Sequence, residues 1–280
     1  MSEAAPKFVF YQYQPSMAAA VIFIIIFVVS TMFHAVVLVR RRTWYFIPFF
    51  IGCAFESIGY IGRAMSSKEY PNFTKDPYII QSLLLLLGPT LLAASIYMIL
   101  GRLIILLRAE SYSIIKPRWL TKFFVLGDVL SFLAQSGGGA LLTTAKSADD
   151  VKKGENVIVG GLGIQILFFG LFIVVTVIFY NRINKAPTGK AMVLDSPWKQ
   201  LLIVLFVTSG LIMIRSIYRV AEYVGGQDGE LQAKEAYLYC LDALPMFLVA
   251  VSYNWFHPSR VINKEAMARR ASVTSLEVMG

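Results

Sequence analysis

Charged side chains recur inside apolar stretches of this chain, at spacings that place them on one face of a helix. Glu56, Tyr60 and Arg63 follow the spacing i, i+4, i+7. A second group, which repeats this kind of spacing, consists of Arg215, Tyr218, Arg219 and Glu222. A charge at the centre of a membrane helix costs about 2.5–3.5 kcal/mol on insertion scales, so such residues usually pair inside a bundle and line a polar path. We therefore interpret these residues as the polar core of a membrane domain.

Other polar residues in the apolar stretches extend this candidate core. Asp242 is expected at the same end of the bundle, whereas Asp128 enters from the opposite end, with Gln135 on its helix face; Gln165 adds an amide. Four acidic groups (Glu56, Asp128, Glu222 and Asp242) against three arginines leave one excess negative charge. Such a site suits a cation, but a salt-bridge network that only holds the bundle together would bury the same residues. Arg63 and Glu222, near an interface, could also extend to water.

The elements that carry these residues are predicted to be seven membrane helices. The chain is 57% hydrophobic and 15% charged. Seven stretches of about 20 residues are apolar enough to cross about 30 Å of hydrocarbon. They are residues 16–39, 44–64, 78–100, 123–142, 157–180, 200–224 and 236–257. We predict an all-α, seven-helix membrane domain over residues 16–258, with an extracellular segment 1–15 before it and a flexible cytoplasmic tail 259–280 after it.

The distribution of basic residues predicts the orientation of the bundle. Fifteen lysines and arginines fall in one set of alternate loops and in the tail, and seven fall on the opposite side. The positive-inside rule then places the amino terminus outside and the carboxyl terminus in the cytoplasm. The sequon at Asn72 lies in a loop that this orientation places outside, where glycosylation occurs. Arg269-Arg270-Ala271-Ser272 resembles a basophilic kinase site, which makes Ser272 a candidate for phosphorylation.

Several function classes are disfavoured. The net charge of +9 is spread over alternate loops, which does not predict a nucleic-acid partner. Intramembrane zinc hydrolases need several histidines, and this chain has only His34 and His257; no P-loop and no nucleophile–base arrangement is found. Cys53 and Cys240 are expected to be buried free thiols. We therefore expect no enzyme, no catalytic residue, no metal site and no cofactor.

The same polar residues carry a resemblance to a known family. The matching strings are Glu56-x-x-Gly59-Tyr60-x-x-Arg63, Leu92 to Met98 with Gly101-Arg102, Asp128-x-x-Ser131-x-x-x-Gln135-x-Gly137-Gly138-Gly139, Gly161-x-x-x-Gln165, Arg215-x-x-Tyr218-Arg219-x-x-Glu222 and Asn254-x-x-His257-Pro258. Over about residues 10–260 the chain resembles the fungal RTA-like family, also called lipid-translocating exporters. Ala20 and Ser259 depart from the family pattern, at the periphery. The resemblance implies seven transmembrane helices and a link to lipid asymmetry, sphingoid long-chain base export, or resistance to toxic sterols and azole-type drugs.

The sequence thus predicts an exporter or translocator of lipids or amphiphilic cations in the fungal plasma membrane. The alternative is a seven-helix sensor that binds a lipid or drug and recruits cytoplasmic partners through residues 108–122, 181–199 and the tail. A scaffold that only modulates other transporters is a third interpretation. The sequence leaves the substrate, the energy source and the oligomeric state open.

Overall fold

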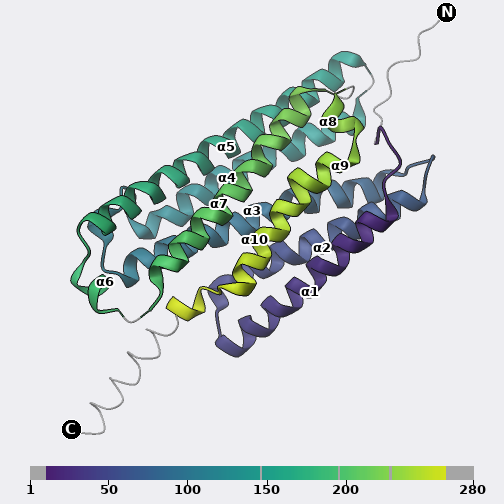
Figure 1. Ribbon diagram of the computed structural model, residues 1–280. Helices are drawn as coiled ribbons and strands as arrows, with labels where there is room; N and C mark the ends of the chain where they lie inside the picture. Colours follow the sequence, from purple (N-terminus) through teal and green to yellow (C-terminus); the bar gives the residue numbers. More distant parts are fainter. Residues whose placement is uncertain (1–10, 146, 195, 227–228, 263–280) are drawn as a thin grey trace, which may run out of the picture.

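The structure of the chain, a computed structural model, describes residues 11–145, 147–194, 196–226 and 229–262. Over these ranges the regular elements are all helical (Figure 1). Seven helical segments are long and apolar enough to cross a membrane, which confirms the predicted fold class. They are α1 (Met17–Arg41), the 3₁₀ turn η1 (Trp44–Phe46) with α2 (Ile47–Lys68), α3 (Lys75–Leu106), α4 (Pro117–Thr144), α5 (Ala148–Lys185), α7 (Trp198–Val224), and the last segment, α9 (Glu235–Leu238) through α10 (Leu244–Trp255).

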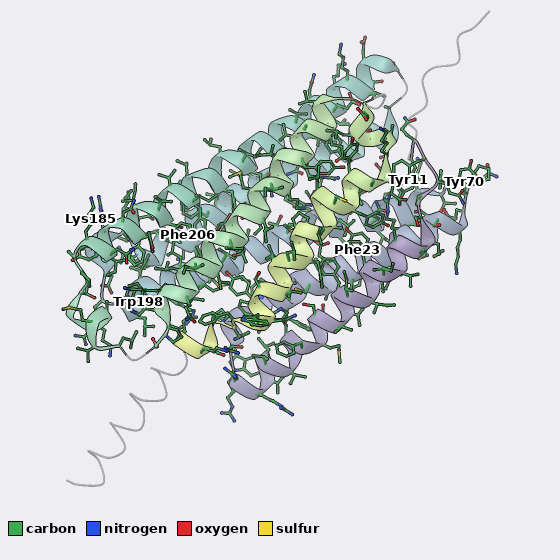
Figure 2. All side chains as sticks on the ribbon, in the orientation of Figure 1. Tyr11, Phe23, Tyr70, Lys185, Trp198 and Phe206 are labelled. Carbon is green, nitrogen blue, oxygen red and sulfur yellow. The ribbon has the colours of Figure 1, made fainter. Side chains whose placement is uncertain are left out.

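The remaining elements are short. They are the 3₁₀ turn η2 (Glu110–Tyr112), α6 (Gly189–Val193) and α8 (Glu230–Ala233). Figure 2 shows Tyr11 and Tyr70 at one end of the bundle, and Lys185 and Trp198 at the other. We call these the amino-terminal end and the carboxyl-terminal end, after the end of the described chain that lies there (Figure 1).

The helices form a ring in which neighbours in sequence are mostly neighbours in space. Packing joins α1 to α2, α2 to α3, α3 to α4, α4 to α5, α5 to α7 and α7 to α10, and α10 returns to α1. In addition, α3 packs against α7 across the ring. The contact between α3 and α7 therefore divides the bundle into two parts, with α1, α2 and α10 on one side and α4 and α5 on the other.

Residues 143–156, which separate the predicted membrane stretches 123–142 and 157–180 and are therefore expected to form a loop, are largely helical, so this expectation is wrong. The Ser147 hydroxyl accepts a hydrogen bond from the Asp150 amide at 3.2 Å and caps α5. Asp149 and Asp150 lie in the first turn, where their negative charges stabilise the helix by interacting with the positive end of its dipole. Gly154 can then pack against Gly138 of α4, where an added Cβ at Gly138 would lie only 2.7 Å from the Gly154 carbonyl oxygen. Capping and close packing thus extend a polar segment as helix.

The final membrane segment contains a local opening of the helix. A π-helical turn, η3 (Tyr239–Ala243), precedes Pro245 and carries Asp242. Proline removes one backbone hydrogen bond from a helix, and π turns are frequent at functional sites. Cys240 in this turn is exposed at the bundle surface, while Cys53 is buried, so the expectation that both thiols are buried is wrong for Cys240.

Candidate functional site

A polar cavity of about 100 Å³ lies at the amino-terminal end of the bundle. Its walls come from the segment before α1 and from α2 to α5 and α7 to η3. Among its lining residues are Tyr11, Gln12, Tyr13, Arg63, Tyr78, Gln81, Ser82, Glu155, Arg219, Glu222, Tyr223, Gln232 and Asp242. Four candidates that are far apart in the sequence, Arg63, Arg219, Glu222 and Asp242, thus face one space.

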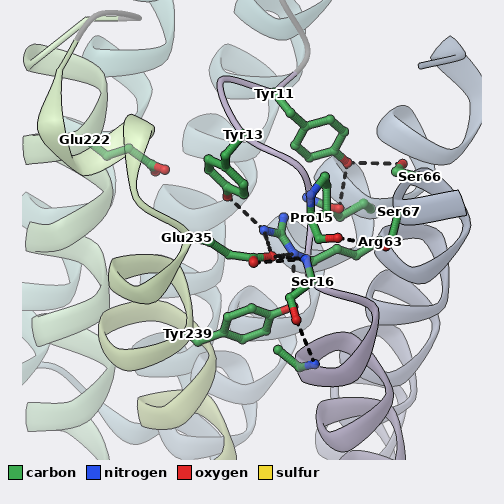
Figure 3. Close-up of polar contacts among 12 residues, drawn as sticks. Tyr11, Tyr13, Pro15, Ser16, Arg63, Ser66, Ser67, Glu222, Glu235 and Tyr239 are labelled. Carbon is green, nitrogen blue, oxygen red and sulfur yellow. Dashed lines mark hydrogen bonds and ion pairs between the residues drawn. The ribbon is translucent and has the colours of Figure 1, made fainter. Parts of the chain in front are cut away.

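Arg63 is the most heavily bonded side chain at this cavity (Figure 3). Its Nη2 lies 2.6 Å from Glu235 Oε1 and donates to the Tyr13 hydroxyl at 2.8 Å. Its Nε donates to the Tyr239 hydroxyl at 3.1 Å, and its side chain is 0% exposed. Arg63 therefore does not extend to water, and that alternative from the sequence is wrong.

The segment before α1 covers the cavity and is held there by hydrogen bonds to Glu235, Gln81 and Ser67. Both Glu235 carboxylate oxygens accept from the Ser16 amide, at 3.0 and 2.9 Å. The Tyr11 hydroxyl donates to Gln81 Oε1 at 2.8 Å, and the Ser67 hydroxyl donates to the Pro15 carbonyl oxygen at 2.7 Å (Figure 3). We call residues 11–16 the strap.

The strap tyrosines are neutral at physiological pH. Burial raises the pKa of the Tyr11 hydroxyl, and the same cause raises the pKa of the Tyr13 hydroxyl. The Arg63 guanidinium, which stands 5.7 and 5.6 Å from the two ring centroids, opposes both shifts without reversing them. The two hydroxyls therefore act as uncharged hydrogen-bonding groups.

Arg215 and Asp242 form an ion pair beneath the polar cavity. Arg215 Nε lies 2.6 Å from Asp242 Oδ1, and the side chains are 1% and 4% exposed. Arg215 Nη2 also donates to the Leu85 carbonyl oxygen at 2.7 Å. This pair therefore joins α7, the π turn and α3.

Arg219 and Glu222 form a second ion pair, within α7. Arg219 Nη1 lies 2.8 Å from Glu222 Oε2, and the Tyr218 hydroxyl donates to Glu222 Oε1 at 3.3 Å. Glu222 is 8% exposed, so this carboxylate is also buried rather than extended to water. The spacing i, i+3 makes this pair a local feature of the helix.

Two buried carboxyl groups have no arginine partner. Among the described residues, four acidic side chains are buried, and of these only Glu222 and Asp242 form ion pairs. Glu56 lies against Gly88, within electrostatic range of Arg215 but without an ion pair in the described chain. Asp128 likewise forms no ion pair in that same part of the chain. A buried carboxyl without a cation is costly, which makes these two positions receptive to one.

Asp128 and the glutamines stand apart from the polar cavity. Asp128 faces the hydroxyl of Tyr97, whose ring packs at 5.4, 6.0 and 4.6 Å from the rings of Phe124, Phe169 and Phe172. Further along α4, Gln135 Nε2 donates to Gln165 Oε1 at 3.3 Å and to the Ser131 hydroxyl at 2.6 Å. The second group of candidate residues thus lies where α4 packs against α3 and α5, apart from the cavity.

Three residues that shape the site escaped the sequence reasoning: Tyr11, Tyr13 and Glu235. Tyr11 and Tyr13 precede the first apolar stretch, and Glu235 stands at the edge of the last one, where charged and aromatic residues are ordinary interfacial anchors. An unmatched Arg63 in a membrane helix was the available signal that a carboxylate must come from elsewhere. Tyr60, by contrast, is buried among Phe23, Phe27 and Tyr239 and serves as core.

Of the two modification candidates, the structure describes only Asn72. Asn72 is exposed between α2 and α3. Ser272 lies outside the described residues.

The chain is similar to several known proteins of yeast. The family described as "RTA1 like protein" matches residues 49–265. Protein RTA1 of Saccharomyces cerevisiae is 41% identical over 275 residues, covering 89% of this chain and 85% of the relative. Protoporphyrin uptake protein 1 of the same species is 36% identical, covering 91% and 93%. Sphingoid long-chain base transporter RSB1 of a Saccharomyces cerevisiae strain is 26% identical, covering 87% and 72%. No solved structure matches.

Proposed function

The chain belongs to the RTA1-like protein family, and from this premise we propose that it moves amphiphilic lipids, in particular sphingoid long-chain bases or related cationic amphiphiles, across the plasma membrane. Exporting such molecules would confer resistance to toxic lipids, sterols or drugs. Lipid transport is supported for the family as a whole, since a relative is described as a sphingoid long-chain base transporter. The chemistry of the head group is our inference from the buried charges.

The observation that carries this proposal is the pair of buried carboxyl groups without an arginine, Glu56 and Asp128. The arginines near the cavity are each matched: Arg63 by Glu235, Arg215 by Asp242 and Arg219 by Glu222. The remaining acidic groups stand near the middle of α2 and of α4. An ammonium head that travels along the bundle would find a charge-assisted hydrogen-bond acceptor at each of them.

The test is the flux of a fluorescent sphingoid base into liposomes that contain only the purified protein. Wild-type protein is expected to move the probe, and Glu56→Gln is expected to abolish the movement. Glu110→Gln is the matched control, because Glu110 is an exposed glutamate at the carboxyl-terminal end. Its flux is expected to equal that of the wild type.

Two results would overturn the proposal. Wild-type protein that is folded but moves no probe would favour a lipid or drug sensor that signals through its cytoplasmic loops. Flux that survives Glu56→Gln would exclude this carboxyl from the path. Thermal unfolding of each variant in detergent establishes whether a loss of flux is a loss of folded protein.

A further inference from the structure

A second cavity, of about 200 Å³, lies between the first half of α3 and the second half of α4, at the amino-terminal end of the bundle. Its lining is largely apolar and includes Ile79, Ser82, Leu83, Leu86, Gln135, Ser136, Gly139, Ala140, Leu142, Thr143 and Ile158. At its rim Ile79 and Leu83 are 38% and 37% exposed, on the surface that faces lipid in a membrane bundle. We call this space the α3–α4 cleft.

The cleft adjoins the polar cavity. Tyr78, Ser82, Leu142, Arg219 and Tyr223 line both spaces. These residues come from α3, α4 and α7, so the junction lies where α3 packs against α7. One side of the junction is polar and covered by the strap, and the other is apolar and open sideways.

The cleft results from a divergence of α3 and α4. Near the carboxyl-terminal end the helices are close, since an added Cβ at Gly101 would stand 3.6 Å from the Pro117 carbonyl oxygen. The rings of Tyr97 and Phe124 also meet there, at 5.4 Å between centroids. Toward the amino-terminal end an added Cβ at Gly139 would meet no atom within 4 Å. The opening therefore widens toward the end that holds the polar cavity.

The polar cavity offers hydrogen-bond donors that the described residues do not use. Arg63 Nη1 and Arg219 Nε are both buried and have no hydrogen-bond partner in the described ranges. Both side chains line the polar cavity. Buried, unsatisfied guanidinium N–H groups are costly, so an oxygen that accepts from them would be bound favourably.

We propose that the α3–α4 cleft binds one alkyl chain of the transported amphiphile, which enters sideways from the membrane, while oxygen atoms of its head accept hydrogen bonds from Arg63 and Arg219. The inference rests on the proposed function and adds an entry route and a head-group chemistry to it. The volume of the cleft is below the roughly 300–1,000 Å³ of drug-sized pockets, which suits one chain rather than the two chains of a bilayer lipid.

Two neighbouring glycines provide a matched pair of variants. An added Cβ meets no atom within 4 Å at Gly139 or at Gly137, but only Gly139 lines the cleft. Gly139→Leu therefore directs a side chain into the cleft from a Cβ position that is open, and Gly137→Leu adds the same side chain at a position that does not line it. Both changes replace a poor helix former with a good one. Thr143→Leu, at another lining position, is a second way to fill the cleft.

The experiment uses a single-chain hydroxylated amine with a photoreactive diazirine on its tail, incorporated into liposomes with the full-length protein. Illumination is expected to attach the probe to residues 79–86 of α3 and 136–143 of α4. Gly139→Leu and Thr143→Leu are expected to lower this labelling several-fold, and Gly137→Leu to leave it unchanged. An amine of equal chain length without hydroxyl groups should compete at least about tenfold more weakly, because it lacks the oxygens that accept from the arginines.

Flux measured on the same samples separates the two hypotheses. Labelling outside α3 and α4, or labelling that Gly139→Leu does not reduce, overturns the proposal that the cleft binds the alkyl chain. This holds even if the wild-type protein moves the probe. Labelling in the cleft without any wild-type flux supports the proposed binding site but refutes the transport proposal. Equal competition by the two amines refutes the head-group assignment alone.

Discussion

Arg215 of α7 and Asp242 of the π turn form an ion pair of 2.6 Å in which neither side chain is more than 4% exposed. The same guanidinium donates to the Leu85 carbonyl oxygen on α3, so one residue holds three membrane segments together. In a buried pair of this kind the two opposite charges compensate each other, and removal of one partner leaves an uncompensated charge.

Neutralising one member of this pair is expected to destabilise the bundle. Asp242→Asn should lower the free energy of unfolding by about 3–5 kcal/mol, because Arg215 keeps its charge in a buried site. Thermal and denaturant unfolding in detergent measure the change. Asp149→Asn, at an exposed position in the first turn of α5, should cost no more than about 1 kcal/mol.

The double variant Arg215→Met/Asp242→Leu is expected to recover much of the lost stability, since it removes both charges. A double-mutant cycle measures their coupling. A double variant as unstable as the sum of the two single variants would show that the pair is not coupled.

Asp128 is as buried as Asp242, but neutralising Asp128 is not expected to destabilise the bundle. Since no arginine or lysine pairs with it within the described chain, Asp128→Asn removes a buried charge without leaving one behind. The free energy of unfolding should stay the same or rise, while flux of a cationic amphiphile falls. Unfolding and liposome flux are measured on the same preparation. A destabilisation as large as that of Asp242→Asn would mean that Asp128 has a cationic partner.

Much of the bundle could be predicted from the sequence, because hydrophobic length is a local property. The seven predicted stretches lie within the helices except for residue 16, which caps α1, and residues 256 and 257, which follow α10. The helix ends could not be predicted where polar segments are involved: α5 begins at Ala148 through a serine cap and packing at Gly154, which no hydropathy pattern reveals.

The candidate site was predictable only in part, because pairing depends on contacts between distant segments. A charge in a membrane helix signals burial, so Arg63, Arg215 and Asp242 could be recognised singly. The partner of Arg63 is 172 residues away and precedes the π turn, and the tyrosines that cover it lie in the strap. The α3–α4 cleft arises where two helices diverge, which no spacing in the sequence indicates.

The strap is expected to open when one hydrogen bond to Arg63 is removed. Tyr13→Phe deletes the acceptor of the 2.8 Å bond from Arg63 Nη2, and a hydrogen bond to a charged group is worth about 1.5–3 kcal/mol. In the Gln12→Cys background, a membrane-impermeant maleimide should then react at least about tenfold faster. Tyr70→Phe, at a tyrosine exposed between α2 and α3, should leave the rate unchanged. Equal rates in Tyr13→Phe and its parent would show that the bond does not hold the strap.

Replacing two adjacent glycines of α4 by alanine is expected to change the free energy of unfolding in opposite directions. A Cβ at Gly138 would stand 2.6 Å from Ile158 Cγ1 and 2.7 Å from the Gly154 carbonyl oxygen, so Gly138→Ala should cost about 1–3 kcal/mol. Gly137→Ala meets no atom within 4 Å and should gain up to about 1 kcal/mol from helix propensity. Unfolding in detergent measures both. Equal effects would mean that α4 and α5 are not in close contact here.

The orientation of the bundle predicts where a glycan can be attached. If the amino-terminal end is outside, Asn72 meets the glycosylation machinery, and an endoglycosidase should increase the gel mobility of the protein made in yeast. Asn72→Gln should abolish this shift. As a control, Ser111→Asn in the Asn72→Gln background creates the sequon Asn-Tyr-Ser in η2, at the opposite end of the bundle, and should remain unmodified. A glycan at position 111 with none at Asn72 would invert the orientation and place the strap on the cytoplasmic side.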